Sequence, residues 1–517
     1  MMEHAGRGLA EVVRQQFDDL EAKSVLGLVG TGNNGGDTLV ALSYLAGWGW
    51  QASAYLVKAR PEDDALVERA RQAGVTIVSG VEDKGRKKLA AALEHHAVLL
   101  DGVLGTGVRL PLRGEAAEVL DFVRRACEQM ERPPVVVAVD CPSGVDCDTG
   151  EAAAEAIPAD LTVTMAAVKQ GLLKFPAYRL EGEVHLVGIG LPDGLKAYEK
   201  VRREVVFEEW VAAVLPPRPL EAHKGTFGTA LVVAGSINFV GAAALAGEAA
   251  YRVGAGLVTL GTVLPVQQAL AGRLPEVTWL PLPHQDGYIA EDAAEVVRDN
   301  LKRVTALLVG PGLGQEETTG EFLRQLLGGE ARAASGRVGF VPLTVERKSA
   351  AETTPALPPL VVDADGLKLL VGIEHWWQKL PAPAVLTPHP GEMAVLCGLD
   401  KEAIQADRVG VAERYAAEWG HVVVLKGAFT VIASPDGRTA VIPVASPALA
   451  RAGTGDVLAG IIVGLRAQGV DAFEAAAAGA WLHAQAGLLA EEMHGNSAAV
   501  MAGDLLVTLP AVLGRLG

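Results

Sequence analysis

The chain alternates short apolar runs with helix-like stretches, and it does so twice along its 517 residues. Stretches such as 37–47 and 115–125 have a helical pattern between the apolar runs of the first half. Continuous apolar strands between amphipathic helices are typical of a parallel sheet covered on both faces. We therefore predict an α/β fold whose first half has strands at 24–29, 51–57, 97–100, 135–140, 161–165 and 184–189.

A charged stretch at 196–209 and the segment Leu215-Pro216-Pro217-Arg218-Pro219 interrupt this alternation. Proline is excluded from helix interiors and central strands, so we place a domain boundary at about 200–215. The prediction is two domains, 1–205 and 206–517, with a surface insertion without chemistry at about 317–359. The second domain should have strands at 229–234, 257–262, 306–309, 360–363, 385–386 and 421–425, and helices at 473–490 and 498–507.

Composition narrows the possible partners. The net charge of −17 argues against nucleic acid. No apolar run is long enough to span a membrane, and the opening residues lack the basic and apolar regions of a signal peptide. The four cysteines show no CxxC spacing, so we expect no disulfide framework and a cytoplasmic location.

The loop Gly30-Thr31-Gly32-Asn33-Asn34-Gly35-Gly36-Asp37 follows an apolar strand and precedes a helix. Glycines let a backbone approach an anion closely, and a helix start adds a favourable dipole. A plain tight turn is the alternative, but the two Asn and the Asp add side-chain donors and oxygen ligands that a turn does not need.

Polar loops also follow the strands that end near Leu100 and Val139, at the edge where open parallel sheets bind ligands. Asn34, Asp101 and Ser143 offer hard oxygen ligands to a cation. Asp140 is a candidate acid or base. Lys169 either lies beside it or is an ordinary solvated lysine.

The sequences Asn33-Asn34-Gly35-Gly36-Asp37, Asp140-Cys141-Pro142-Ser143-Gly144 and Val168-Lys169-Gln170-Gly171 resemble the NAD(P)H-hydrate epimerase family. The resemblance implies a Rossmann-like domain that interconverts the R and S hydrates of the reduced nicotinamide ring. It implies potassium on Asn34, Asp101 and Ser143, and proton transfer by Asp140, with Lys169 as a further catalytic candidate. It also implies substrate contacts at Asn33, Asn34, Gly35, Gly36, Asp37, Gly105, Thr106, Gly107, Val108, Arg109, Leu110, Pro111 and Asp140.

Two positions depart from that family. Thr38 stands where a glycine is usual, and the chain starts almost at Glu3, so most of the customary N-terminal helix is expected to be missing. The second departure bears on dimerisation and on how well the pocket is covered.

In the second half, Gly453-Thr454-Gly455-Asp456 opens a long helical stretch. Small residues at a helix start expose N–H groups that can hold phosphoryl oxygens, and an Asp there can accept a proton from an attacking hydroxyl. The alternative is an Asp N-cap with a flexible glycine entry.

This segment resembles the ribokinase-like superfamily. With Gly310-Pro311-Gly312-Leu313-Gly314, Val362-Asp363-Ala364-Asp365 and Thr387-Pro388-His389-Pro390-Gly391-Glu392 it resembles the NAD(P)H-hydrate dehydratase branch. The resemblance implies a ribokinase-like domain with Asp456 as base and Ala242, Gly312, His389 and Asp456 on the hydrate. It places the nucleotide on Lys426, Gly427, Ala428, Phe429, Thr430, Gly453, Thr454 and Gly455. Ala452 departs from a usual glycine.

The combined expectation is a repair enzyme for hydrated NADH and NADPH (NADHX and NADPHX), with K⁺ in the first domain and Mg²⁺ and ADP in the second. ADP rather than ATP rests on bacterial relatives and on no residue of this chain. We expect small-molecule partners and a homo-oligomer. The alternatives are a ribokinase-like small-molecule kinase fused to a non-catalytic ligand-binding domain, and a ligand sensor or scaffold.

Overall fold

The computed structural model describes residues 1–192, 194–196, 198–328 and 356–517. The contacts divide the chain into two units, Met1–Lys200 and Val201–Gly517, which are described separately. The division falls close to the predicted boundary, but residues 201–205 belong to the second unit. Their strand β8 (Arg203–Val205) pairs with a strand of that unit's sheet.

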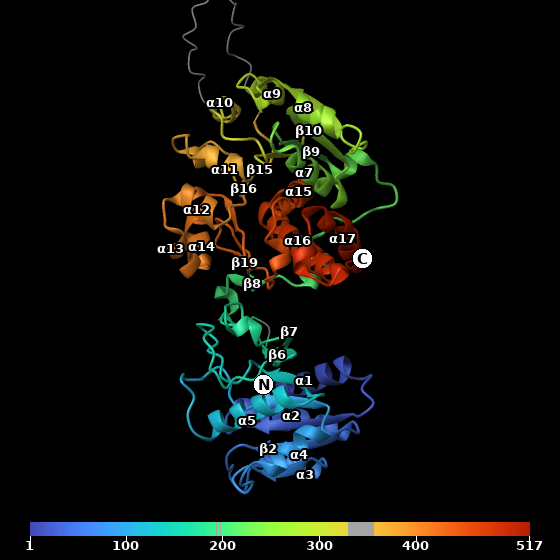
Figure 1. Cartoon of the computed structure of the whole chain (residues 1–517), viewed down its shortest axis with the longest axis vertical. Coiled ribbons are helices and arrows are strands. Elements are labelled where there is room, and N and C mark those ends of the chain that lie inside the picture. Colours follow the sequence, from blue (N-terminus) through green and yellow to red (C-terminus); the bar gives the residue numbers. More distant parts are fainter. Residues whose placement is uncertain (193, 197, 329–355) are drawn as a thin grey trace, which may run out of the picture. The chain divides into compact units, whose positions relative to one another are not determined.

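The first unit is built on a parallel sheet of seven strands in the order β3-β2-β1-β4-β5-β6-β7 (Figure 1). All six predicted strands are present. Thr76–Ser79 was not predicted and forms an edge strand, β3. The strands are β1 (Ser24–Val29), β2 (Gln51–Leu56), β3 (Thr76–Ser79), β4 (Val98–Gly102), β5 (Val135–Val139), β6 (Leu161–Met165) and β7 (Glu183–Val187).

Helices cover both faces of this sheet, because successive side chains of a strand point to opposite faces. Val25 and Val29 of β1 pack with α1, α2 and α3, whereas Leu26 and Leu28 pack with α4 and α5. The helices are α1 (Met2–Gln16), α2 (Asn33–Gly47), α3 (Ala65–Gln72), α4 (Lys87–His95) and α5 (Glu115–Gln129).

The N-terminal helix departs from the expectation. Most of it was expected to be missing, but α1 has 15 residues and buries Leu9, Ala10 and Val13 against the sheet. Its amphipathic period is visible in the sequence, since Ala5, Leu9 and Val13 recur on one face.

The Thr38 side chain fits between α2 and the sheet because the strands beside it carry glycine, Gly27 in β1 and Gly102 in β4. A Cβ at Gly102 would lie 1.9 Å from the Thr38 Oγ1, and one at Gly27 would lie 2.7 Å from its Cγ2. The hydroxyl donates to the Asn34 carbonyl one turn earlier in α2. The departure from the usual glycine is therefore accommodated within the core.

The second unit has a sheet of ten described strands, ordered β11-β10-β9-β14-β15-β16-β17-β18-β19-β8 (Figure 1). Neighbours are parallel except around β18, which is antiparallel to β17 and to β19. The strands are β8, β9 (Thr229–Val233), β10 (Leu257–Val263), β11 (Thr278–Leu282), β14 (Ala306–Val309), β15 (Leu360–Val362), β16 (Val385–Leu386), β17 (Val422–Leu425), β18 (Val431–Ala433) and β19 (Thr439–Val441), with a separate hairpin β12 (His284–Gln285) and β13 (Tyr288–Ile289).

The C-terminal helices of this unit pack together. In Figure 1, α15 lies against α7, and α16 lies beside α17. The helices are α6 (Glu208–Val214), α7 (Val240–Arg252), α8 (Leu264–Leu270), α9 (Ala293–Asp299), α10 (Glu317–Leu326), α11 (Asp365–Leu370), α12 (Pro390–Cys397), α13 (Lys401–Ala406), α14 (Arg408–Trp419), α15 (Thr454–Ala467), α16 (Ala472–His494) and α17 (Ala502–Arg515).

The surface insertion was predicted at about 317–359, but this prediction places its start too early in the chain. Residues 317–326 form α10, which buries Phe322, Leu323 and Leu326 in the core. Residues 329–355 of the predicted insertion lie outside the described part of the chain. Leu360–Val362 is β15, inside the sheet.

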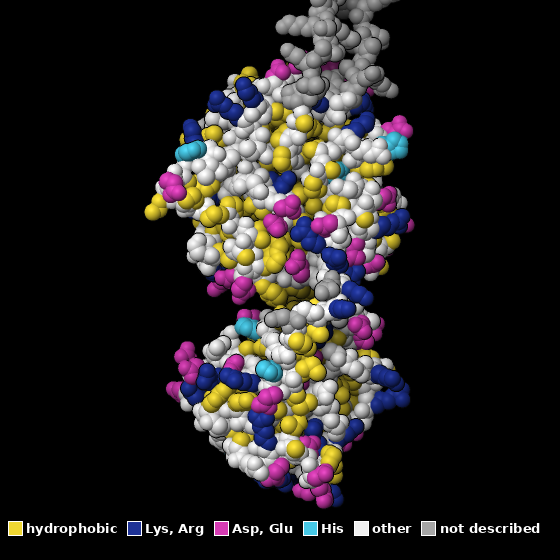
Figure 2. Space-filling view, turned by 180° about the vertical axis from the view of Figure 1, so that it is seen from behind, with side chains coloured by type: hydrophobic (Ala, Val, Ile, Leu, Met, Phe, Trp, Pro, Cys, Tyr) yellow, Lys and Arg dark blue, Asp and Glu magenta, His cyan; other side chains and the backbone are white. Residues whose placement is uncertain are grey.

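No helix among the described residues combines the length and hydropathy needed to cross a membrane. On the face drawn in Figure 2, basic and acidic side chains are interspersed over the surface of each unit.

Candidate active sites

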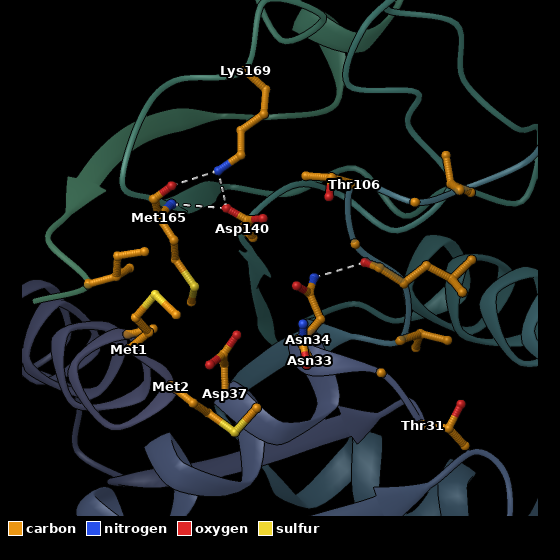
Figure 3. A pocket seen from close by; sticks show the side chains of 18 residues that line it. Met1, Met2, Thr31, Asn33, Asn34, Asp37, Thr106, Asp140, Met165 and Lys169 are labelled. Atoms are coloured by element: carbon orange, nitrogen blue, oxygen red, sulfur yellow. Dashed lines mark hydrogen bonds and ion pairs between the residues drawn. The ribbon is translucent and has the colours of Figure 1, made fainter. Parts of the chain in front are cut away.

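A cavity of about 770 Å³ opens at the carboxyl ends of the strands in the first unit (Figure 3). It brings together nine of the residues predicted to bind substrate or act in catalysis. Those nine are Asn33, Asn34, Asp37, Gly105, Thr106, Gly107, Val108, Asp140 and Lys169.

Gly35, Gly36, Arg109, Leu110 and Pro111 are not among the residues that line it. Gly35 and Gly36 lie so close to neighbouring atoms that a side chain at either position would collide with them. A Cβ at Gly35 would lie 2.0 Å from the Gly30 carbonyl oxygen, and one at Gly36 would lie 2.7 Å from the Met2 Cε. Gly35 thus lets the start of α2 approach the backbone just past β1, and Gly36 lets α1 approach α2.

Asp140 lies just past the end of β5 with a φ of 69°, in the left-handed region that an aspartate seldom adopts. Its Oδ1 accepts the Met165 N–H at 3.0 Å and is paired with the Lys169 ammonium. Lys169 also donates to Thr164 Oγ1 at 3.0 Å and to the Met165 carbonyl at 2.8 Å. Lys169 is therefore held against Asp140 and is not an ordinary solvated lysine.

Asp37 faces this pair from α2, on the other side of the cavity (Figure 3). Its side chain makes no hydrogen bond or ion pair with any described residue. Burial, and then the nearby Asp140 carboxylate, raise its pKa from the ordinary 3.8 to about 7. The first cavity thus holds two carboxyl groups in different environments.

Asn34, Asp101 and Ser143 meet beside the cavity. The Asp101 Oδ2 accepts the Ser143 N–H at 2.9 Å, and the Ser143 hydroxyl exchanges hydrogen bonds with the backbone of Leu104. The Asn34 amide donates to the Leu104 carbonyl at 2.9 Å and to the Val139 carbonyl at 2.6 Å.

Asp101 is fully buried and has no cationic partner among the described residues. Burial raises the pKa of its carboxyl. A hard cation bound there would compensate that charge, and the surrounding oxygen atoms suit such an ion. These residues therefore fit the predicted potassium ion.

Sequence reasoning missed the apolar wall of this cavity. Met1 precedes α1, Met2 and Ala5 belong to it, Met165 ends β6, and Ile189 follows β7. Apolar residues carry no chemical signal in a sequence, so only the fold could place them.

The second unit has a cavity of about 490 Å³ lined by three predicted substrate residues, Ala242, Gly312 and Asp456. Gly312 has a φ of 62°, and a Cβ there would lie 2.7 Å from the Phe239 Cβ and 2.8 Å from the Ala242 Cβ. Glycine at this position thus shapes the cavity floor. The remaining lining residues are Phe239, Tyr288, Gly314, Gln315, Glu316, Ala364, Asp365 and Lys368.

Asp456 lies in the first turn of α15, whose N-cap Gly453 has a φ of 91°. Burial and the Asp363 carboxylate raise the pKa of Asp456 to about 7, although Lys426 opposes them. A carboxyl group with this pKa can accept a proton near neutral pH.

Lys426 lies next to this helix start, and its ammonium would be 3.4 Å from a Cβ at Gly455. It donates to Asp363 Oδ1 at 2.7 Å and lies 3.6 Å from Glu392 Oε2. Burial disfavours its charge, but Asp363 and Glu392 outweigh that effect and raise its pKa. Lys426 is therefore a permanent cation inside an acidic cluster.

His389 is the N-cap of α12. Its Nδ1 accepts the N–H groups of Gly391 and Glu392 at 3.0 and 3.1 Å, while its side chain stays 53% exposed. The structure thus gives this residue a capping role. Its contact with substrate stays a prediction.

The predicted nucleotide segment Lys426–Thr430 is the turn between β17 and β18. Gly427 has a φ of 146°, and Thr430 closes the turn by donating to the Gly427 carbonyl at 2.9 Å. Ala428 is exposed, whereas Phe429 is buried. The turn begins at Lys426, beside the start of α15.

His483 of α16 was missed. Its buried Nε2 donates to the Thr454 carbonyl at 2.9 Å, and burial lowers its pKa to about 4. A lone histidine in an alanine-rich helix gives no sequence signal. The hydrogen bond from His483 holds the first turn of α15, which carries Asp456.

Two cavities lined by carboxyl groups, one in each unit, are the sites of a two-domain α/β enzyme. Residues 230–511 match the family model described as NAD(P)H-hydrate dehydratase, and residues 1–171 match that of the YjeF-related protein N-terminus.

Relatives match over the whole chain. It is 37% identical to the bifunctional NAD(P)H-hydrate repair enzyme Nnr of Moorella thermoacetica, covering 100% of this chain and 92% of the relative. The identity to the Salinibacter ruber enzyme of the same name is 36%, covering 99% and 91%. A solved structure, the ADP/ATP-dependent NAD(P)H-hydrate dehydratase of Bacillus subtilis, is 32% identical, covers 61% of this chain and 99% of that one, and has a TM-score of 0.48. The chain belongs to the family of bifunctional NAD(P)H-hydrate repair enzymes.

Proposed function

We propose that the first domain interconverts the R and S hydrates of NADH and NADPH, and that the second dehydrates the S form at the expense of ADP, giving AMP and phosphate. The observation that carries the proposal is Asp456, a carboxyl group with a pKa of about 7 at a glycine-flanked helix start that lines a cavity. That position suits a base that works next to phosphoryl oxygens.

In the dehydration step, Asp456 takes the proton of the ring hydroxyl, and the hydroxyl oxygen attacks the terminal phosphoryl group. Backbone N–H groups of residues 453–455 and the Lys426 ammonium stabilise the charge that develops. The ring nitrogen lone pair then expels phosphate, and loss of a proton from the neighbouring carbon restores the double bond.

A magnesium ion fits this site because carboxylates outnumber the cations there. Asp363, Asp365, Glu392 and Asp456 face Lys426 and Lys368. Asp363 and Glu392 would hold the ion together with nucleotide phosphates, and it would supply charge neutralisation of the transferred phosphoryl group.

In the first domain, Asp140 is the proton-transfer group, and Lys169 holds its carboxylate in place. Asn34, Asp101 and Ser143 would hold potassium, which supplies a fixed positive charge next to the anionic substrate. We also propose that the enzyme is cytoplasmic and homo-oligomeric, and that it binds neither nucleic acid nor a membrane.

The test uses a mixture of R and S hydrates with ADP, followed by the return of near-ultraviolet absorbance. The native chain should restore the whole mixture. The Asp140→Ala variant should restore the S fraction and then continue only at the spontaneous epimerisation rate. A small-molecule kinase would instead leave a stable phosphorylated product, and a sensor would restore nothing.

A further inference from the structure

The two carboxyl groups of the first cavity have unequal partners. Asp140 is paired with Lys169 and accepts the Met165 N–H. Asp37 is 6% exposed and has no hydrogen-bonding or cationic side-chain partner among the described residues. Figure 3 shows the two carboxyl groups pointing into the same space from α2 and from the end of β5.

We propose that Asp37 is a second catalytic acid–base group of the epimerase, working with Asp140 across the substrate ring. This inference rests on the proposed function and assigns Asp37 a chemical role in addition to the substrate contact expected from the sequence. The two carboxyl groups share one proton. When the reaction starts in one of its two directions, that proton is on Asp37.

The chemistry requires one acid and one base on opposite faces. The protonated Asp37 donates to the hydroxyl group on the carbon next to the ring nitrogen. The carbon–oxygen bond breaks, water leaves, and the nitrogen lone pair forms an iminium ion. A second water adds to the opposite face while Asp140 takes one of its protons, which forms the new carbon–oxygen bond and returns the electron pair to nitrogen.

The reverse reaction uses the same pair with the roles exchanged, because the product state leaves the proton on Asp140 and the charge on Asp37. Both directions therefore need one proton on the pair. Exchange of that proton with solvent resets the pair, and no oxidant or other reactant is consumed.

A purely binding role for Asp37 fits less well. The substrate is a dinucleotide with an anionic pyrophosphate, and an ionised carboxylate without a partner would repel it. A neutral carboxyl group avoids this repulsion and can also donate a proton. When one pocket holds two carboxyl groups in different environments, one of them usually acts as the acid and the other as the base.

The charged groups that line this cavity are few. Facing Asp37 are Asp140, the Lys169 ammonium and the Met1 amino group. Burial and Asp140 raise the pKa of Asp37 to about 7, and the amino group opposes them. Epimerisation should therefore slow as the pH rises above about 7, where the pair loses its shared proton.

The test is Asp37→Asn in the full chain, with R-to-S conversion followed by chromatography. We expect kcat to fall on the order of 10²–10⁴-fold with a far smaller change in KM, as for loss of a general acid. The decline above about pH 7 should disappear in the variant, and Asp37→Glu should restore part of kcat. In oxygen-labelled water, native turnover should place the label in the product hydroxyl.

Asp63→Asn is the matched control, because Asp63 is an exposed carboxylate of the same domain. Dehydration of the S hydrate reports on the second domain in the same samples. An unchanged kcat with a raised KM in Asp37→Asn would overturn the proposal, and so would a native rate that does not fall above pH 7. If Asp140→Ala abolishes epimerisation while Asp37→Asn does not, the proposed function stands and only the role of Asp37 fails.

Discussion

Replacing Asp456 by Asn should abolish most of the dehydration and at the same time stabilise the second domain. The substitution removes the proton acceptor but keeps the shape of the side chain, so the rate should fall on the order of 10²–10⁴-fold. In the native chain, dehydration should increase as the pH rises through about 7, because Asp456 works as a base only when ionised.

The stability change follows from the same pKa. The folded state raises the pKa of Asp456 from 3.8 to about 7, so the folded chain holds this proton more tightly than the unfolded chain does. Stability is therefore lost as the pH rises from about 4 to about 7. At about 1.4 kcal/mol per pKa unit the full loss is about 4 kcal/mol, and partial solvent screening reduces the expected gain in the variant to about 2 kcal/mol.

Asn at this position leaves Lys426 paired with Asp363 and close to Glu392, so no buried cation loses its partner. The assays are restoration of near-ultraviolet absorbance from the S hydrate and chemical unfolding at about pH 5, where only part of the loss has occurred, and at about pH 8, where the loss is complete. Asp299→Asn, at an exposed site of the same domain, is the control. Near-normal dehydration, or equal stability changes at the two pH values, would refute the reasoning.

Three further outcomes are expected. Asp101→Ala should weaken potassium binding and slow epimerisation, which is measured by comparing potassium with a bulky organic cation; dehydration of the S hydrate should not change. Gly312→Ala should raise KM for the hydrate more than it lowers kcat, since the added Cβ meets Phe239 and Ala242, and steady-state kinetics at varied hydrate concentration will show whether it does. Each NADH restored should be accompanied by one AMP and one phosphate, and a stable organic phosphate in the product analysis would contradict the proposed donor chemistry.

The sequence predicted the parallel sheets because fully buried strands leave continuous apolar runs, as in Val135–Val139. Strands of weaker pattern were missed. Thr76–Ser79 is an edge strand that is mostly half-exposed, and Val431–Ala433 and Thr439–Val441 have only three residues each. Their identity as strands depends on neighbours that the local sequence does not specify.

The site residues likewise divide into those that the sequence indicated and those that only the fold brought together. Asp140 and Asp456 stand in segments rich in glycine or proline that have a chemical pattern of their own. The pairing of Lys169 with Asp140 and of Lys426 with Asp363 required the fold, because 29 and 63 residues separate the partners. His483 reaches the second site only through packing, and nothing near it in the sequence indicates a ligand.

The strand β8 has a practical consequence for anyone who wishes to produce the second domain alone. Its residues 203–205 pair in parallel with β19, and Arg203 binds Glu413 through two hydrogen bonds of 2.7 and 2.9 Å. A fragment that starts at residue 206 would leave the N–H and C=O groups of β19 without a neighbouring strand. An edge strand promotes association between copies unless it is short or charged, so such a fragment, with the buried β19 at its edge, should aggregate, whereas one that starts at Val201 keeps the short edge strand β8 with Arg203 and Glu204.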